Sequence, residues 1–306
     1  MAVTTATPDK AAPRRTVPNY GSMKSDRQWA LRWSYFFLSI FAFFFLLPPI
    51  YMFITSLKTS AEISAATNPW WVFNPTISNY VGLLTSRQFL GFFVNSALVA
   101  IFVVTITMLI SVPAAFALAR MRFWGSTTLA TGVFLTYLIP ETLLFIPLFK
   151  MFSVFNEITG IQLLNRWWVL LIVYPTLTVP FCTWIMIGYF ASIPKELDEA
   201  AVIDGATWMQ TLTKIFIPVA LPGIIAATIF AFTVSWAQFL YPLAFLTSTD
   251  QLVMPVGIIQ TLIKGDVFNW GQIMTGALLG AAPPLIIYAF LMDYYIAGLT
   301  AGATKG

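Results

Sequence analysis

The chain has 306 residues, of which 58% are hydrophobic and only 9% are Asp, Glu, Lys or Arg. Soluble domains carry roughly 25% charged residues, so this composition excludes a protein that faces water on all sides. Its apolar residues must face lipid instead. The sequence has no His and a single Cys, Cys182. This excludes an internal disulfide, a cysteine metal cluster and the usual near-neutral acid–base side chain.

Six apolar stretches are long enough to cross a bilayer as helices, which takes roughly 20 residues each. They are continuously apolar and lack the alternation of a membrane β-barrel. The first stretch follows basic residues, as a secretory signal does, but it is longer than a signal core and we expect it to be retained. The sequence thus predicts an all-α, polytopic membrane protein with spans near Trp33–Thr55, Phe92–Ala119, Thr127–Phe149, Trp167–Phe190, Val219–Leu246 and Gln272–Ala297.

The distribution of Lys and Arg predicts the orientation of these spans. With the N-terminus inside, 11 of the 16 basic residues are cytoplasmic, which the positive-inside rule favours. Both termini are then cytoplasmic. The net charge of +4 reflects basic inner loops rather than nucleic-acid binding. The inner residues are Lys10, Arg14, Arg15, Lys24, Arg27, Arg32, Arg120, Arg122, Lys195, Lys214 and Lys305.

We expect three regions along the chain. Residues 1–32 form a cytoplasmic tail, which is poor in large apolar residues and predicted to be disordered up to about Asp26. Residues 33–297 form the six-span domain, with a long inner loop over 191–218. Residues 298–306 form a cytoplasmic C-terminal tail. The outer segments are expected at 56–91, 150–166 and 247–271.

Acidic residues are scarce in the spans. Glu141 is the one clearly inside a span, and Asp293 lies near the inner end of the last. An ionisable group in a span is costly and tends to face a cavity or a partner. Glu141 follows Pro140, however, so it could instead satisfy backbone groups that the proline frees. No Walker A sequence and no zinc-protease signature occurs, so we expect no enzymatic activity and no metal site.

The inner loop carries the most informative pattern. Pro194 suits a first helical position, and Glu196, Asp198 and Glu199 favour the positive end of a helix dipole. Ala200 and Ala201 offer a small, closely approachable face, and Gly205 can turn the chain. A second helical stretch is predicted from Thr207 to Pro218. Physically, the loop is either a short helix displayed to a cytoplasmic partner or a solvated connector.

Here the sequence resembles a known family. Glu199-Ala200-Ala201, Gly205 and Ile215-x-Ile217-Pro218 are similar to the EAA loop of ABC-transporter membrane subunits, with Ile217 in place of Leu. Asp204 before the glycine is typical of the carbohydrate branch. Asn95-Ser96, the stretch Ala114 to Gly125 and the terminus Gly298 to Gly306 agree. At Trp236-Ala237-Gln238-Phe239, Ala237 and Gln238 depart from the family's Asn and Glu.

The resemblance is to the maltose-type sugar importer permease, specifically the six-span partner of a heterodimeric pair with the type I importer fold. It implies a second permease, two ATPase subunits that bind ATP and Mg²⁺, an extracytoplasmic solute-binding protein, and a place in the inner membrane of a bacterium or archaeon. It implies no cofactor in this chain and no nucleic acid. The loop from Pro194 to about Trp208 would be the coupling helix, outer loop 247–271 would meet the binding protein, and the tail with Lys305 would enter the ATPase interface. The implied coupling residues are Glu199, Ala200, Ala201, Asp204, Gly205 and Lys305.

Two other functions remain open from the sequence. An ion-coupled carrier needs ionisable or unwound-helix sites near the midplane, for which the chain offers Glu141 alone. A scaffold without transport fits poorly with the many prolines in the spans. The sugar is not specified. Side chains able to stack on it or hydrogen-bond to it, and equally able to serve as packing, are Glu141, Tyr137, Trp236, Gln238 and Tyr241, with Trp184 beside them.

Overall fold

The computed structural model describes residues 21–67, 70–121, 123–264 and 267–300, and the chain divides into two units, Met1–Tyr51 and Met52–Gly306. Among the described residues, five helices are long and apolar enough to cross a membrane, and a bent helix pair makes a sixth span if it is counted as one. This agrees with the predicted number. The five are Arg27–Ser56, Arg87–Arg120, Glu141–Thr159, Trp167–Ser192 and Trp270–Met292, and the bent pair is Trp208–Val219 with Leu221–Ala237.

The first unit consists, in its described part, of most of helix α1 (Gly21–Ser56). The helix begins at Gly21, so the disorder predicted up to about Asp26 is wrong for residues 21–26, and residues 21–32 of the predicted tail are helical. Residues 1–20 lie outside the described part. Large apolar side chains are exposed all along the helix, including Phe37, Phe41 and Phe45. A helix that is apolar on all sides is typical of a membrane span.

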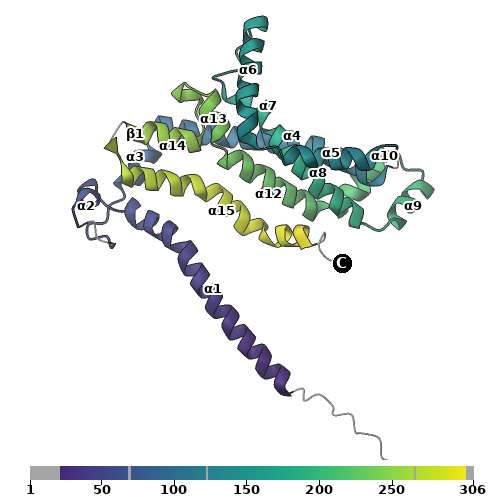
Figure 1. The fold of residues 1–306 in the computed structure, drawn as a ribbon, viewed down its shortest axis with the longest axis horizontal. Coiled ribbons are helices and arrows are strands. Elements are labelled where there is room, and N and C mark those ends of the chain that lie inside the picture. Colours follow the sequence, from purple (N-terminus) through teal and green to yellow (C-terminus); the bar gives the residue numbers. More distant parts are fainter. Residues whose placement is uncertain (1–20, 68–69, 122, 265–266, 301–306) are drawn as a thin grey trace, which may run out of the picture. The chain divides into compact units, whose positions relative to one another are not determined.

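The second unit is built on four long helices, α4 (Arg87–Arg120), α8 (Pro175–Ser192), α12 (Leu221–Ala237) and α15 (Trp270–Thr300). Helix α4 packs against α8 and α12, and α12 packs against α15 (Figure 1). Small residues allow these close approaches. Ala227 and Ala231 of α12 are fully buried, and Gly223 lies directly under the ring of Tyr189.

Two hydrophobic clusters lie along α4, one at each half of the helix. Phe92, Val99 and Val103 belong to the first, and Val112 and Phe116 belong to the second. A buried polar layer separates them. The hydroxyls of Thr107 and Thr178 lie 2.6 Å apart, and Ser111 Oγ donates to the Val179 carbonyl at 3.2 Å. Each of these hydroxyls has a hydrogen-bond partner, so the layer joins α4 to α8 without leaving these buried polar atoms unpaired.

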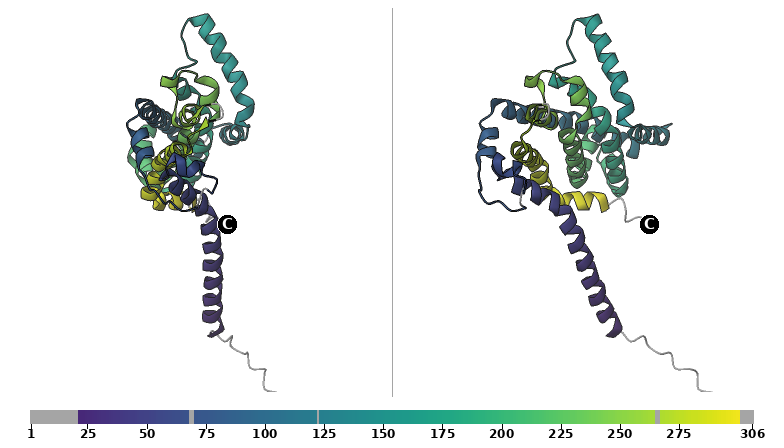
Figure 2. Two further views of the ribbon diagram at one scale, coloured as in Figure 1. Left: turned by 90° about the vertical axis from the view of Figure 1, so that its left-hand side faces the viewer. Right: turned by 60° about the vertical axis from the view of Figure 1, so that its left-hand side comes forward.

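The predicted continuous span Thr127–Phe149 is wrong. The structure has two helices there, α5 (Ser126–Tyr137) and α6 (Glu141–Thr159), with a break at residues 138–140. Pro140 has no N–H and takes an extended backbone (ψ 124°), which stops the helix. Helix α6 therefore continues through residues 150–159, which had been expected as an outer loop. It extends away from the four long helices (Figures 1 and 2).

The predicted span Val219–Leu246 is also divided. Helix α12 ends at Ala237, and a short helix α13 (Leu240–Phe245) follows. Before α12, the chain bends by 81° at Ala220. The helical stretch before the bend comprises α10 (Trp208–Gln210), the π-helix η2 (Thr211–Phe216) and α11 (Ile217–Val219). It confirms the predicted second helix of the inner loop.

Short elements complete the described part of the second unit. Two strands of two residues each pair antiparallel, Ile263 with Phe268 and Lys264 with Val267. The elements are α2 (Ser60–Ser64), α3 (Ser78–Leu84), η1 (Trp167–Val169), α7 (Leu170–Val173), α9 (Glu196–Ile203), η3 (Thr249–Gln251), α14 (Met254–Leu262), β1 (Ile263–Lys264) and β2 (Val267–Phe268).

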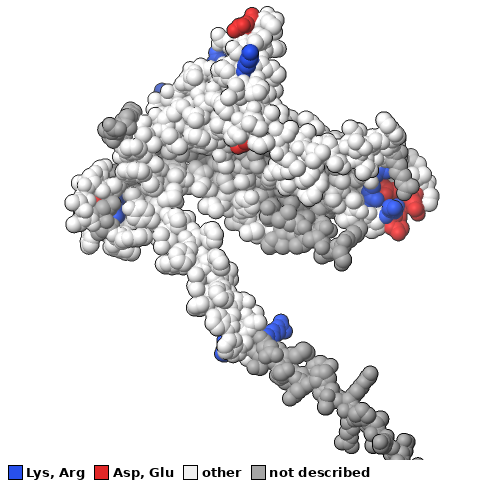
Figure 3. Space-filling view, in the orientation of Figure 1, with Lys and Arg blue, Asp and Glu red and all other residues white. Residues whose placement is uncertain are grey.

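Charged side chains of the second unit gather at a few places on the visible face. Figure 3 shows them around α9, near α2 and toward the far end of α6, while the surface between these places is uncharged apart from one acidic spot near the centre. An uncharged belt of this kind is suited to lipid contact, because a charged group in the hydrocarbon region is costly.

Candidate functional site

We call residues 193–219 the inner segment. It begins with α9, whose first turn carries Glu196, Asp198 and Glu199, as predicted. The helix is shorter than expected, because it runs from Glu196 to Ile203 rather than from Pro194 to about Trp208. Carboxylates in the first turn are stabilised by the helix dipole.

Gly205 ends α9 with a left-handed backbone (φ +70°). The amide of Ala206 donates to the Ala201 carbonyl at 2.9 Å, and the amide of Gly205 donates to the Val202 carbonyl at 3.1 Å. This is a helix C-cap in which glycine avoids the strain of a side chain. Thr207 then starts the next helix with a capping box to Gln210.

The turn exposes an apolar tip between acidic side chains. Val202 and Ile203 are 69% and 85% exposed. Met209, which follows the turn, is exposed as well. Glu199, Ala200, Asp204 and Gly205 are exposed as well. Ala201 is buried within this chain, so it faces inward instead of offering the approachable surface expected of it.

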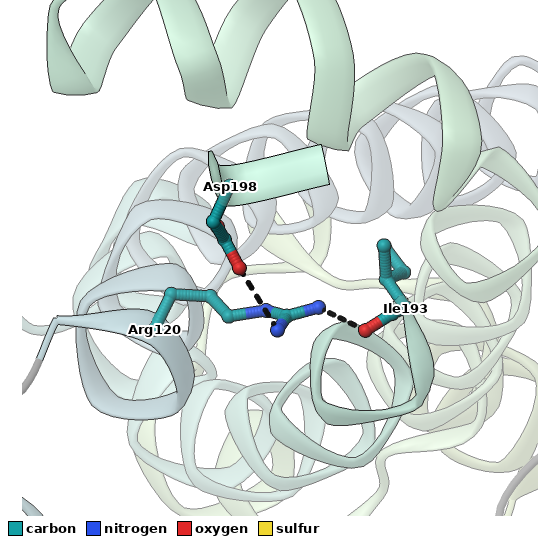
Figure 4. A network of polar contacts seen from close by, with 3 residues as sticks. All are labelled: Arg120, Ile193 and Asp198. Atoms are coloured by element: carbon teal, nitrogen blue, oxygen red, sulfur yellow. Dashed lines mark hydrogen bonds and ion pairs between the residues drawn. The ribbon is translucent and has the colours of Figure 1, made fainter. Parts of the chain in front are cut away.

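A single cation ties the inner segment to α4. Arg120, the last residue of α4, has a side chain that is only 5% exposed, and its Nη1 lies 3.1 Å from Asp198 Oδ2 (Figure 4). Its Nη2 donates to the Ile193 carbonyl. Its Cζ lies 4.9 Å from the centre of the Phe216 ring. One guanidinium thus contacts the residues before, within and after α9.

The inner segment also borders a cavity. A pocket of about 420 Å³ is lined by Ala119, Arg120, Lys195, Asp198, Glu199 and Trp208. It lies where α4 meets α9, and acidic and basic side chains face it together.

A second pocket lies at the break between α5 and α6. It holds about 470 Å³ and is lined by Thr136, Tyr137, Leu138, Ile139, Pro140, Glu141, Leu144, Thr176, Leu177 and Val234. The Glu141 carboxylate accepts a hydrogen bond of 2.8 Å from Gln238 Nε2. Gln238 Oε1 in turn accepts from the amides of Phe239 and Leu240, so this side chain also caps α13. The structure therefore brings Glu141, Tyr137 and Gln238 to one place.

Aromatic rings stand beside this pocket. Tyr137 stacks on Phe181 at 4.8 Å between ring centres, and Phe181 contacts Phe230 at 4.3 Å and Trp184 at 5.9 Å. A half-exposed tyrosine over such a stack offers an apolar face and a hydroxyl together.

Trp236 and Tyr241, by contrast, are buried in packing. The Trp236 indole donates to the Gly280 carbonyl at 2.7 Å, and its ring packs against Phe93 and Phe232, so it holds α12 to α15 and α4. Tyr241 is fully buried, and its hydroxyl donates to the Glu141 carbonyl at 3.3 Å. Both side chains therefore support the pocket through packing and do not line it.

The expected outer loop 247–271 is largely structured. Asn95 donates to the carbonyls of Asp250 and Leu252, at 3.0 and 2.9 Å, and Ser96 Oγ accepts from the Met254 amide at 2.8 Å. Met254 and much of α14 are buried. The middle of this stretch is therefore packed within the chain.

Some expected residues are not described. Lys305 and the tail 301–306 lie outside the described residues, as does Asp266, and the side chains of Lys264 and Asp293 are also outside the described part. Within the part of the chain that is described, no three His, Cys, Asp or Glu side chains gather closely enough to hold a metal ion.

Two structural anchors were not singled out from the sequence. The sequence indicates Arg120 only as an inner basic residue within the stretch Ala114 to Gly125. Its position directly after an apolar stretch is the one local sign that it could anchor the end of a helix. Asn165 has a left-handed backbone (φ 58°), and its side-chain oxygen accepts from the amides of Thr247 and Ser248. Nothing in the local pattern around Asn165 marks this role, since its partners are 82 and 83 residues away.

Comparisons with known proteins agree with this arrangement. Residues 108–300 match the family described as "Binding-protein-dependent transport system inner membrane component". The chain is 35% identical to the sulfoquinovosyl glycerol transport system permease protein SmoH of Agrobacterium fabrum, over 85% of this chain and 89% of that one. It is 32% identical to the trehalose/maltose transport system permease protein MalG of Thermococcus litoralis, over 85% and 92%.

A solved structure shares the fold. It is a bacterial ABC transporter involved in the import of the acidic polysaccharide alginate, with a TM-score of 0.74 at 22% identity, covering 89% of this chain and 98% of that one. The predicted all-α importer permease fold is therefore confirmed. The relatives are permease subunits rather than enzymes, as expected for this chain. The chain belongs to the binding-protein-dependent inner membrane components, and is a multi-pass permease subunit of an ABC transporter in the bacterial inner membrane.

Proposed function

We propose that this chain forms half of the translocation pathway of an ATP-driven sugar importer, together with a second, homologous permease. Two cytoplasmic ATPase subunits bind ATP and Mg²⁺, and a solute-binding protein delivers sugar from outside. The names of the relatives, which transport sulfoquinovosyl glycerol and trehalose or maltose, support a sugar or sugar derivative. Family membership favours this function over an ion-coupled carrier.

The observation that carries the proposal is the inner segment. Its exposed apolar tip, Val202 and Ile203, stands between the exposed acids Glu199 and Asp204 on a short, capped helix. An apolar centre with a charged rim is the usual anatomy of a protein-binding surface. We assign docking of the ATPase to this tip, with Ala200 allowing close approach, Ala201 supporting α9 from within and Lys305 joining from the tail.

Gly205 provides the test of this assignment. Gly205→Val forces a β-branched side chain into a left-handed backbone, which costs at least about 1–2 kcal/mol and distorts the tip. We expect uptake in reconstituted proteoliposomes to fall roughly tenfold, since 1.4 kcal/mol is a factor of ten, with normal insertion. Gly125→Val is the matched control, because Gly125 also has positive φ (+85°) and open space around it. Equal uptake by the two variants would contradict the assignment.

The sugar pathway is proposed to pass the pocket at Glu141. Tyr137 would stack on a sugar ring, and Glu141 and Gln238 would hydrogen-bond to its hydroxyls, with Trp236 and Tyr241 supporting the wall. No Lys or Arg is among the described residues that line this pocket. A carboxylate without a basic side chain from this chain favours a neutral sugar over an acidic one.

Glu141→Gln tests the pathway, because it removes the charge at almost constant shape. We expect sugar uptake to fall by roughly tenfold, the loss that follows from one charge-assisted hydrogen bond of about 1.5 kcal/mol. Glu157→Gln is the control, since Glu157 is an exposed carboxylate on the same helix α6. Unchanged uptake kinetics in Glu141→Gln would show that the charge of Glu141 has no role in the sugar pathway. We call residues 247–271 the outer segment, because the predicted topology places them outside. The outer segment is proposed to contact the binding protein around Lys264 and Asp250.

A further inference from the structure

We propose that Arg120 is a positioning residue that transmits movement of α4 to the inner segment. It fixes α9 to the transmembrane bundle so that the docking tip moves with α4 rather than freely. This inference rests on the proposed function, in which α9 is the element that docks the ATPase. The role concerns how the tip is held, and Arg120 itself need not touch the ATPase.

The contacts of Arg120 reach three different parts of the inner segment. Ile193 precedes α9 and Asp198 lies on α9 (Figure 4). Phe216 follows α9. With the Arg120 side chain 5% exposed and Asp198 27% exposed, water screens the pair little. A planar guanidinium can donate to a carboxylate, donate to a carbonyl and stack on a ring at once, whereas an ammonium is a single point charge.

The ring on which the Arg120 guanidinium lies is tightly packed. Phe216 is fully buried, and its ring packs against Phe116 of α4 at 5.1 Å and Phe190 of α8 at 5.8 Å. Phe216 therefore belongs to the second hydrophobic cluster, and Arg120 sits over that cluster. Displacing the end of α4 must displace Arg120, Phe216 and Asp198 together.

The other half of α4 holds the outer segment. Asn95 and Ser96 bind the backbone of residues 250–254 through three hydrogen bonds. Helix α4 has 34 residues and is about 50 Å long at 1.5 Å per residue. One helix thus binds the outer segment near one end and the inner segment at the other. Coupling between distant sites requires a physical element that both sites bias, and α4 meets both.

The ion pair between the two side chains is a single contact. It joins Arg120 Nη1 to Asp198 Oδ2. Arg120 Nε and Asp198 Oδ1 are buried without a hydrogen-bond partner among the described residues. The side-chain link between Arg120 and α9 therefore depends on this one contact.

The experiment uses the complete transporter, with both permeases, the ATPase pair and the sugar-loaded binding protein, in proteoliposomes. It measures sugar imported per ATP hydrolysed, and separately the ATPase that co-purifies. Arg120→Gln and Asp198→Asn are expected to lower sugar imported per ATP by at least about fivefold, the low end of ordinary coupling effects, while the ATPase still co-purifies. Arg120→Lys should recover part of the ratio. Lys150→Met, which removes an exposed cation from α6, should leave it unchanged.

The double variant Arg120→Gln/Asp198→Asn makes the test specific to the pair. If the two side chains act through one contact, the double variant is no worse than the more impaired single variant. A wild-type ratio in both single variants overturns the inference, and so does loss of co-purified ATPase with an unchanged ratio, which marks Arg120 as merely structural. If Arg120→Gln does not fold, Asp198→Asn decides alone. A wild-type complex without ATPase or sugar-stimulated hydrolysis would instead overturn the proposed function, and this inference with it.

Discussion

Two glycines, one on α14 and one on α15, show how closely the helices of the second unit approach. A Cβ added to Gly257 of α14 would overlap the ring of Phe92, which is itself buried in α4. A Cβ added to Gly276 of α15 would lie 3.4 Å from Ile258, an ordinary contact. The two positions have the same residue type in helices but differ in the space around them.

We therefore predict that Gly257→Ala lowers the free energy of unfolding by about 1–3 kcal/mol, the usual cost of overpacking a filled core. The clash must outweigh a gain of up to about 1 kcal/mol in helix propensity. Gly276→Ala, the matched control, should leave it unchanged or raise it by up to about 1 kcal/mol, because the same gain in helix propensity meets no clash there. Thermal unfolding of the purified chain in detergent measures both. Equal midpoints for the two variants would show that the helices do not approach as closely as described.

The elements of the bundle carry polar anchors as well as apolar faces. Helix α4 is apolar enough to span a membrane, yet it buries Asn95, Ser96, Thr107 and Ser111. Each side chain has a partner on another segment: the outer segment for the first two, and α8 for the others. Polar side chains fix the position of one element on another where apolar packing alone would allow sliding.

Asn95→Ala is predicted to release the outer segment from α4. The carbonyls of Asp250 and Leu252 lose their donor, and each unsatisfied buried group costs about 1–3 kcal/mol. Amide hydrogen exchange over residues 249–254 should become faster, while exchange in the centre of α4 stays unchanged. Thr105→Ala is the control on the same helix, because the Thr105 hydroxyl is exposed and bonds only to the Ile101 carbonyl. Unchanged exchange in Asn95→Ala would mean that packing of α14 holds the segment without these bonds.

The whole molecule is organised by the scarcity of charge. The chain has only 28 Asp, Glu, Lys and Arg residues, taking its 16 basic and 12 acidic residues together. The predicted orientation places 11 of the 16 basic residues on the cytoplasmic side. The inner segment and both chain ends then face the cytoplasm, and residues 160–166 face outward.

Single cysteines can test this orientation directly. Cys182 is the only native cysteine and is fully buried, so the unmodified chain should label weakly. Ile161→Cys, after α6, is predicted to react with a membrane-impermeant maleimide on intact cells. Thr213→Cys, exposed in the inner segment, should react only after the membrane is opened. The opposite pattern would reverse the predicted topology.

The sequence determined the features that follow from local pattern. Continuous apolar stretches and 9% charge require membrane helices. So much apolar surface must face lipid, and a helix satisfies its own backbone hydrogen bonds there. The acids at the start of α9 and the turn at Gly205 were predictable, since dipole and left-handed backbone preferences act within a few residues. The resemblance then identified the family, which the comparisons confirm.

Only the tertiary structure decided which side chains meet. Pro140 was visible in the sequence, yet whether it kinks a span or ends it depends on the surroundings, and here it ends α5 and turns α6 away. Gln238 reaches Glu141 across 97 residues, and Arg120 reaches the Ile193 carbonyl across 73. Such contacts are set by how the helices pack, and local propensities carry no information on the distance between residues so far apart in the chain.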